Sequence, residues 1–293
     1  MLKLQGHRGK VRALAFSPDG RRLASVAGRE RHASLWELPA GTRTLSLGDA
    51  DEVQSVAYAP DGESMLIASG RHLRRWHIAT GTITERWFRG SNYCWQVAYS
   101  PDGSLLAALC YNRRGEADRF RVDLFRPAQA GRLAKFFVGG YGWPMCLAFS
   151  PTGRFLAAGG ADKTLRVWGV KPEAKAVWFK CAGNVLAVTI FANDTLVAVS
   201  AGKKITLYDF ATHKPCGELT GHTGHVCALG AAPDGTILSA ADDGTARLWD
   251  ITGRRERACF DWNIGGLNVA AFSPDGMLAA VGGEDEIVVW DIE

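Results

Sequence analysis

Short apolar segments separated by polar turns run through the whole sequence. Segments 11–16, 53–58 and 267–272 are rich in apolar and β-branched residues, the composition typical of strands. Residues 164–168 alternate polar and apolar side chains, as a strand with one buried face does. No segment keeps the 3.6-residue period of an amphipathic helix. The pattern therefore predicts an all-β chain with almost no helix.

A short phrase, Ala-Phe-Ser-Pro-Asp-Gly or a variant of it, returns about every 40 residues. Its copies begin at Ala15, Ala57, Ala98, Ala148 and Ala271, a shortened copy begins at Ala232, and a degenerate one begins at Phe191. Proline presets φ for a tight turn and glycine takes the position that needs a positive φ, so each copy predicts a turn between two strands. A second phrase follows each copy and ends in an aromatic residue: Trp36, Trp76, Phe125, Trp168, Tyr208, Trp249 and Trp290. Seven such units account for all 293 residues.

Each unit has room for four strands. In the first unit these are 11–16, 22–26, a strand ending at Trp36, and 44–47. A four-stranded sheet has two faces to cover, and only the neighbouring units can cover them. A radial arrangement meets this need, because each blade packs on the next and only short edges stay exposed. We therefore predict a single domain, residues 1–293, that forms a seven-bladed β-propeller of four-stranded antiparallel blades.

Two dipeptides link this pattern to a known family. Gly6-His7 and Gly221-His222 precede the first strand of their units, and Trp249-Asp250 and Trp290-Asp291 close the third. These pairs resemble the Gly-His and Trp-Asp marks of WD40 repeats, and the resemblance extends over essentially the whole chain. The last unit ends after its third strand, whereas Leu2–Leu4 stands where a fourth strand belongs. As in WD40 propellers, we expect Leu2–Leu4 to complete the last blade and close the ring.

Unit six contains the residue types of a hydrolase triad, His222, Ser239 and Asp243. The resemblance to WD40 domains implies a different role, a buried hydrogen-bond network that these residues form with Trp249. Such a network is physically reasonable, since a buried indole or imidazole N–H must find a partner. Unit one offers a similar set, with Glu30 in place of the aspartate: His7, Ser25 and Trp36. Units two to four lack the histidine, so we expect packing to hold them.

The sequence contains little that favours catalysis or metal binding. His222, His225 and Cys227 suggest a metal site by spacing, but they fall at a strand start, and we expect a structural histidine and an exposed turn histidine. Asp242-Asp243-Gly244 resembles part of a calcium loop without its downstream carboxylates. The seven cysteines form no CxxC pair, and no nucleotide-binding, GxSxG or HExxH motif occurs. We predict no catalytic residue, no metal and no cofactor.

Loops held by rigid sheets are then the natural place for function. In WD40 propellers the loops entering the first strand and joining the second and third strands form the top face, the usual partner surface. Units three and four carry large side chains there: Tyr93, Trp95, Tyr141, Trp143 and Met145. Aromatic residues at a turn position that is polar in other units are typical of a binding surface. The same rings would also serve to cover the loops below them or to pack between blades, and both interpretations stay open.

Charged residues in the equivalent loops suggest a polarised top face. The long unit-three insertion adds Tyr111, Arg113, Arg114 and Arg119, and units one and two add Arg29, Arg31, His32 and Arg71. The acidic residues of units six and seven are Asp242, Asp243, Glu284, Asp285 and Glu286. Such a face favours a protein or peptide partner with acidic groups near apolar anchors, although charged loops are often merely solvated.

Two alternative functions are binding of single-stranded nucleic acid and catalysis in the central channel. Arginines beside Trp95 and Trp143 would suit single-stranded nucleic acid, but Arg254, Arg255 and Arg257 lie apart from that sector. The net charge of +4 is also too small to indicate nucleic-acid binding. An enzyme built on the central channel would need ionisable residues on the innermost strands, where segments 13–15 and 55–57 are small and mostly apolar.

The amino-acid composition is that of a globular protein. Hydrophobic residues make up 47% of the chain and charged residues 22%, as in ordinary globular proteins. No apolar run approaches the roughly 20 residues that span a bilayer, and the start lacks the features of a signal peptide. We expect a cytoplasmic, monomeric, non-catalytic scaffold for protein–protein interaction that does not bind membranes. The alternative functions are binding of single-stranded nucleic acid and, less favoured, catalysis in the central channel.

Overall fold

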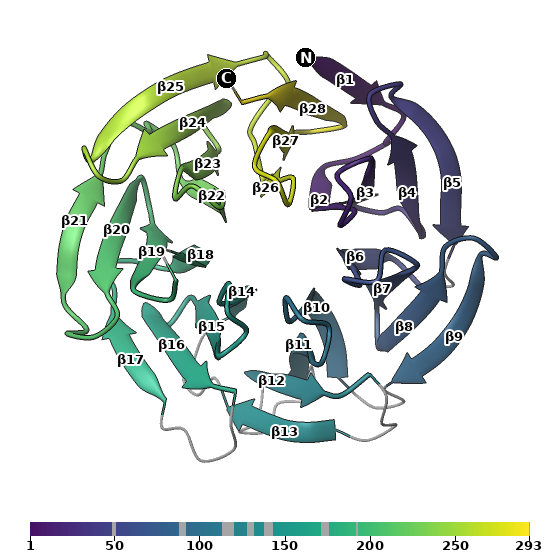
Figure 1. Ribbon diagram of the computed structural model, residues 1–293, viewed down its shortest axis with the longest axis horizontal. Helices are drawn as coiled ribbons and strands as arrows, with labels where there is room; N and C mark the ends of the chain where they lie inside the picture. Colours follow the sequence, from purple (N-terminus) through teal and green to yellow (C-terminus); the bar gives the residue numbers. More distant parts are fainter. Residues whose placement is uncertain are drawn as a thin grey trace.

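The computed structural model describes residues 1–48, 51–87, 92–112, 120–127, 132–137, 143–170, 176–191 and 193–292. Within these ranges every regular element is a strand, and the strands form seven four-stranded sheets around a central axis (Figure 1). The predicted all-β, seven-bladed propeller is confirmed.

The blades are numbered in chain order, with the strands of each given from the axis outwards. Blade 1 contains β2 (Val11–Phe16), β3 (Arg22–Ala27), β4 (His32–Glu37) and β5 (Thr42–Gly48). Blade 2 contains β6 (Val53–Tyr58), β7 (Ser64–Ser69), β8 (His72–His77) and β9 (Thr82–Trp87). Blade 3 contains β10 (Asn92–Tyr99), β11 (Leu106–Asn112), β12 (Phe120–Phe125) and β13 (Arg132–Phe137). Blade 4 contains β14 (Pro144–Phe149), β15 (Phe155–Gly160), β16 (Thr164–Gly169) and β17 (Val177–Lys180). Blade 5 contains β18 (Val185–Phe191), β19 (Leu196–Ala201), β20 (Lys204–Asp209) and β21 (Pro215–Leu219). Blade 6 contains β22 (Val226–Ala231), β23 (Ile237–Ala241), β24 (Thr245–Asp250) and β25 (Arg255–Asp261). Blade 7 contains β26 (Val269–Phe272), β27 (Leu278–Gly282), β28 (Glu286–Asp291) and β1 (Leu2–Gln5).

The two ends of the chain meet in blade 7. Strand β1 pairs antiparallel with β28, with Leu2 opposite Val289 and Leu4 opposite Ile287, and Figure 1 shows both termini on this blade. Leu4 is only 1% exposed and packs in one apolar cluster with Trp36 of blade 1. The N-terminal strand therefore closes the ring, as predicted.

The recurring phrase forms the turn between the first and second strands. In blade 1 the Gly20 N–H donates to the Ser17 carbonyl at 2.9 Å, and Gly20 has a φ of 70°. The Ser17 hydroxyl donates to Asp19 at 2.6 Å, and this hydrogen bond is the main reason that the pKa of Asp19 is lowered. The same serine and aspartate pair recurs in blades 3 and 7. In blades 1, 3 and 7 the phrase is thus a self-contained turn that forms without help from a neighbouring blade.

Six of the seven innermost strands contain a β-bulge near their first residue. The residue that the register passes over is Arg12, Gln54, Trp95, Met145, Leu186 or Cys227. A bulge leaves one residue unpaired and redirects its side chain. All six of these residues line the central cavity, so the bulges of these six blades each place one variable side chain at the channel.

Candidate functional site

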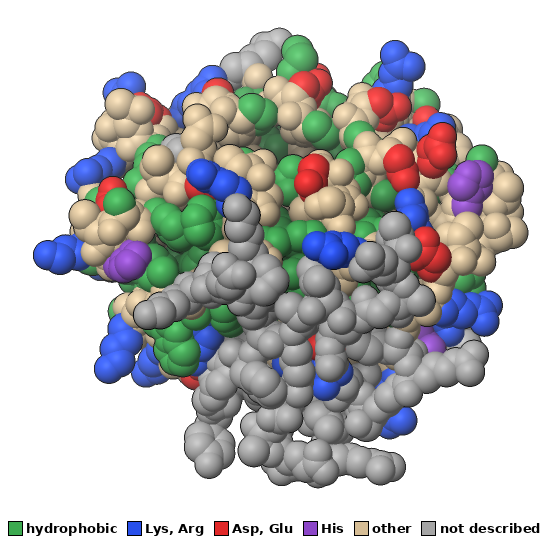
Figure 2. Space-filling view, turned by 60° about the horizontal axis from the view of Figure 1, so that its bottom comes forward, with side chains coloured by type: hydrophobic (Ala, Val, Ile, Leu, Met, Phe, Trp, Pro, Cys, Tyr) green, Lys and Arg blue, Asp and Glu red, His purple; other side chains and the backbone are tan. Residues whose placement is uncertain are grey.

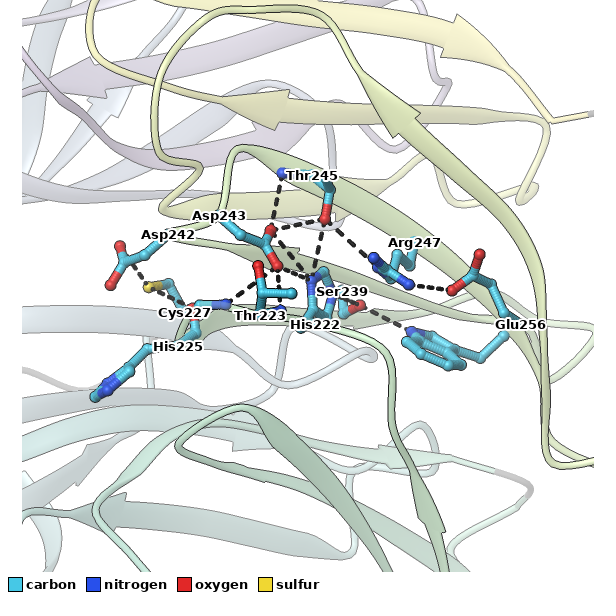
Figure 3. A network of polar contacts seen from close by, with 12 residues as sticks. His222, Thr223, His225, Cys227, Ser239, Asp242, Asp243, Thr245, Arg247 and Glu256 are labelled. Carbon is cyan, nitrogen blue, oxygen red and sulfur yellow. Dashed lines mark hydrogen bonds and ion pairs between the residues drawn. The ribbon is translucent and has the colours of Figure 1, made fainter.

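The residues that resemble a hydrolase triad form a closed hydrogen-bond network in blade 6 (Figure 3). The Trp249 indole N–H donates to Ser239 Oγ at 2.8 Å, and Ser239 Oγ lies 2.7 Å from His222 Nε2. His222 Nδ1 lies 3.0 Å from Asp243 Oδ2, which also accepts the Thr223 N–H at 2.7 Å. Each polar group therefore has a partner along a line from the indole to the carboxylate.

Blade 1 contains the same network with a longer acidic side chain. Trp36 Nε1–H donates to Ser25 Oγ at 2.7 Å, and Ser25 Oγ lies 2.7 Å from His7 Nε2. His7 Nδ1 lies 2.7 Å from Glu30 Oε2, and the Arg8 N–H donates to Glu30 Oε1 at 2.8 Å. Glutamate thus takes the place that aspartate has in blade 6.

The titration behaviour of both networks favours a neutral imidazole beside an ionised carboxylate. Burial lowers the pKa of His7 and of His222 despite the neighbouring acid. Burial alone would raise the pKa of Glu30, but hydrogen bonds from Arg8 and His7 lower it overall. The imidazole then donates from Nδ1 to the carboxylate and accepts the serine proton at Nε2. Since Ser25 and Ser239 are fully buried, no substrate carbonyl reaches either hydroxyl, and the geometry is that of a structural network.

Blades 2 and 7 lack the serine that accepts the indole N–H in blades 1 and 6. Ile67 and Val281 occupy the register position that Ser25 has in blade 1. Consistent with this, Trp76 Nε1 and Trp290 Nε1 have no hydrogen-bond acceptor among the described residues. Packing against apolar neighbours holds these two indoles in place.

The residues that suggest a metal by spacing do not form a shared site. His225 points away from the blade 6 network in Figure 3, while Cys227 Sγ lies 3.3 Å from Asp242 Oδ1. Burial, followed by the hydrogen bond to Asp242, raises the pKa of Cys227 to about 12. Within the described part of the chain, no three His, Cys, Asp or Glu side chains gather as a metal site would require.

An aromatic cluster lies on the top face of blades 3 and 4. This face is formed by the loops before the innermost strands and the loops between the second and third strands. Tyr93 of β10 pairs with Tyr111 of β11, and their rings stack with centroids 5.4 Å apart. The Trp143 ring meets Tyr111 edge-on, with centroids 5.2 Å apart. The Arg71 guanidinium carbon lies 5.2 Å from the centre of the Tyr93 ring. The structure therefore brings together four of the predicted residues from blades 2, 3 and 4.

Two tryptophan side chains at this cluster are exposed to solvent. Trp95 is 42% exposed and Trp143 is 57% exposed. Trp95 and Met145 are both bulge residues, so their side chains leave the strand pairing and line the channel entrance. Arg29 is exposed and lies in blade 1, away from the stacked rings, and its backbone N–H donates to Glu52 Oε1 at 2.7 Å. Tyr141, Arg113 and Arg114 lie outside the described residues.

Comparison with known proteins finds repeats of one family in three parts of the chain. The family model described as WD domain, G-beta repeat matches residues 1–37, 131–169 and 213–250. The chain thus contains WD40 repeats and folds as a seven-bladed β-propeller.

Several WD40 relatives match a large part of the chain. WD repeat-containing protein AAC3 of Dictyostelium discoideum is 27% identical over 175 residues, which is 58% of this chain and 35% of that protein. Nuclear distribution protein PAC1 of Coccidioides posadasii is 26% identical over 196 residues, 59% of this chain and 41% of that protein. Actin-interacting protein 1 of Drosophila melanogaster is 26% identical over 268 residues, 83% of this chain and 40% of that protein. The WD40 chain thus spans less than half the length of these three relatives.

The central channel of this WD40 propeller is a cavity of about 930 Å³. Small apolar side chains such as Ala13, Val56 and Ala98 form much of its wall. Lys10 and Arg12 are the charged residues among its described lining, and both lie towards the top face. The described wall therefore lacks the paired acid and base that hydrolysis by general acid–base catalysis would use.

One polar contact at the channel entrance was not predicted from the sequence. Arg12 Nη1 donates to Glu52 Oε1 at 2.8 Å and to Gln54 Oε1 at 2.6 Å, linking blades 1 and 2. A usable signal was present, because Arg12, Gln54, Trp95 and Met145 each stand four residues before the aromatic residue of the recurring phrase. Aligning the units on that phrase would have found all four positions.

The charges of the described surface are mixed. On the face shown in Figure 2, Lys and Arg side chains are interspersed with Asp and Glu. Arg255 and Arg257 belong to the outermost strand of blade 6, across the ring from blade 3 in Figure 1. Among all the residues that the structure describes, no helix is long and apolar enough to cross a membrane.

Proposed function

We propose that this WD40 propeller is a non-catalytic scaffold that binds a protein or peptide partner on its top face. The observation that carries the proposal is the pair of solvent-exposed indoles, Trp95 and Trp143, beside the stacked rings of Tyr93 and Tyr111. Large aromatic side chains held on a rigid frame lose little conformational freedom on binding and are enriched at binding hot spots.

The partner's chemistry follows from the residues around this cluster. Arg71 beside Tyr93, together with the exposed blade 1 residues Arg8, Lys10, Arg29 and Arg31, places positive charge on the top face of blades 1 and 2. A segment with an apolar anchor and nearby acidic groups complements this surface. One relative, Actin-interacting protein 1, is named for a protein partner, which supports protein binding as the role of the present chain.

The absence of paired ionisable groups from the described channel wall supports a non-catalytic role. Burial of both network serines supports it further, because the residues that resemble a triad are committed to holding blades 1 and 6.

Affinity capture with two matched tryptophan variants tests the proposal. Trp178 on β17 is 60% exposed, similar to Trp143, but lies on the outermost strand of blade 4. We expect Trp143→Ala to lose proteins that the unmodified chain retains, and Trp178→Ala to retain them. If both variants capture the unmodified set, or both lose the same proteins, the top-face assignment is wrong.

A further inference from the structure

A second cavity opens beside the aromatic cluster, between blades 2 and 3. Its volume is about 370 Å³, within the usual range for sites that hold a small ligand or a side chain. The Cys94 N–H donates to the Gly70 carbonyl at 2.9 Å and joins the two blades along one wall. Arg12, Gln54 and Trp95 line both this cavity and the central channel. The two spaces therefore adjoin at the channel entrance.

The cavity combines aromatic rings with an excess of carboxylates. Tyr93, Trp95 and Tyr111 supply the rings, and Asp51 and Glu52 supply two acids against the single guanidinium of Arg12. This composition favours a cation, because a ring face attracts positive charge and a carboxylate can pair with it.

The contacts of the two carboxylates show which one faces an incoming ligand. Glu52 is occupied, since it accepts Arg12 at 2.8 Å and the Arg29 N–H at 2.7 Å. Among the described residues, the hydrogen-bond or ion-pair partner of Asp51 is His72 Nδ1, at 3.1 Å, and the Asp51 side chain is 47% exposed. Asp51 is therefore the carboxylate with acceptor capacity left for a partner.

The molecule already contains one cation on this aromatic surface. The Arg71 guanidinium lies 5.2 Å from the Tyr93 ring centre, within the range of a cation–π interaction. The geometry shows that a planar guanidinium fits on these rings. Trp95, which is part of both cavities and 42% exposed, offers a second ring to an external group.

We propose that the cavity between blades 2 and 3 receives an arginine side chain of the bound partner, with its guanidinium near Asp51 and Trp95. This deepens the proposed function and rests on it. Arginine fits better than lysine because a planar guanidinium can stack on an indole and also donate two parallel hydrogen bonds to a carboxylate. The acidic groups of the same partner would lie over the basic loops of blade 1.

A small probe tests the cavity without the partner. The unmodified propeller is titrated with N-acetyl-arginine amide and, in parallel, with the neutral isostere N-acetyl-citrulline amide, while the tryptophan indole N–H signals are followed by NMR. The Trp95 signal is assigned by its loss in Trp95→Phe. We expect the arginine probe to shift this signal saturably, and the citrulline probe to bind at least about fivefold more weakly, as loss of a cation–π contact predicts.

Two acid variants separate a specific site from general attraction. Asp51→Asn should weaken the arginine probe about fivefold or more, whereas Asp242→Asn, an exposed acid on the top face of blade 6, should leave it unchanged. Urea unfolding of both variants checks that the fold is intact. Equal responses to the two probes, an Asp51→Asn variant that binds normally, or no saturable shift would each overturn the inference. Partner loss in Trp143→Ala would still support the proposed function in that event, so the two failures are distinguishable.

Discussion

Asp194 of blade 5 takes the place of the aspartate that blade 4 lacks. In blade 4 the recurring phrase has Thr152 where other copies have aspartate. The Thr152 hydroxyl donates to Asp194 Oδ2, and Arg154 Nε lies 3.3 Å from the same oxygen. Asp194 is only 4% exposed although it has a φ of 67° in the degenerate copy of the phrase. The two irregular copies are thus complementary across a blade boundary.

This relationship predicts a rescue. Asp194→Ala removes the buried carboxylate that accepts from the exposed side chains of Thr152 and Arg154, and should cost about 0.5–1.5 kcal/mol in the free energy of unfolding. Adding Thr152→Asp to that variant recreates the regular phrase beside Ser150 and should recover part of the loss. Thr152→Asp alone should destabilise the chain, because it sets a second carboxylate against Asp194. Urea unfolding of the two single variants and the double variant measures the coupling, and additive effects would contradict the cross-blade role.

The blade 6 network predicts a large difference between two adjacent aspartates. Asp243→Ala leaves His222 and the N–H groups of Thr223 and Gly224 without their acceptor. Each unsatisfied group costs about 1–3 kcal/mol where it is buried, so we expect a loss of at least about 2 kcal/mol. Asp242→Ala changes an exposed side chain and should shift stability by less than about 0.5 kcal/mol. Similar urea midpoints for the two variants would argue against the network's structural role.

The same networks predict that acid destabilises the protein in two stages. Because the pKa of His7 and His222 is lowered in the folded state, the unfolded chain binds protons first as the pH falls below about 6.5. Stability is then lost with a slope of up to about 1.4 kcal/mol per pH unit for each histidine. The lowered pKa of Glu30 and Asp243 adds a second loss below about pH 4.

Urea midpoints between pH 7.5 and 5 measure the first stage. The His222→Asn variant replaces a titrating group with one that stays neutral, so its stability should depend less on pH over this interval, whatever its stability at pH 7.5. A slope as steep as that of the unmodified chain would show that other groups cause the acid effect.

The fold was predictable because its signals are local and repeated. The Ser17–Asp19 turn and its equivalents in blades 3 and 7 are complete within one unit, so these copies of the phrase specify their own structure. The contacts that remained hidden join different units. Asp194 with Thr152, and Arg12 with Glu52, bring together residues about 40 positions apart whose pairing depends on how two blades pack. The exposure of Trp95 depends in the same way on a β-bulge, which the residue types around it do not specify.

Strand β1 (Leu2–Gln5) closes the ring, so we expect it to be as important to stability as any internal strand. Leu4 is 1% exposed and packs with Val11, Trp36 and Ile287, so it joins blades 7 and 1. Leu4→Ala should cost about 2–5 kcal/mol, because the cavity it leaves is lined by two blades that cannot both move inwards. Lys3→Ala is the matched control: the Lys3 side chain is 40% exposed and its Nζ lies 3.9 Å from Glu286 Oε2, an interaction that contributes at most about 1 kcal/mol. Thermal and urea unfolding of the two variants provide the comparison. Equal stability of Leu4→Ala and Lys3→Ala would mean that the ring does not depend on β1, whereas a loss confined to Leu4→Ala would identify this strand as the element that holds the seven blades closed.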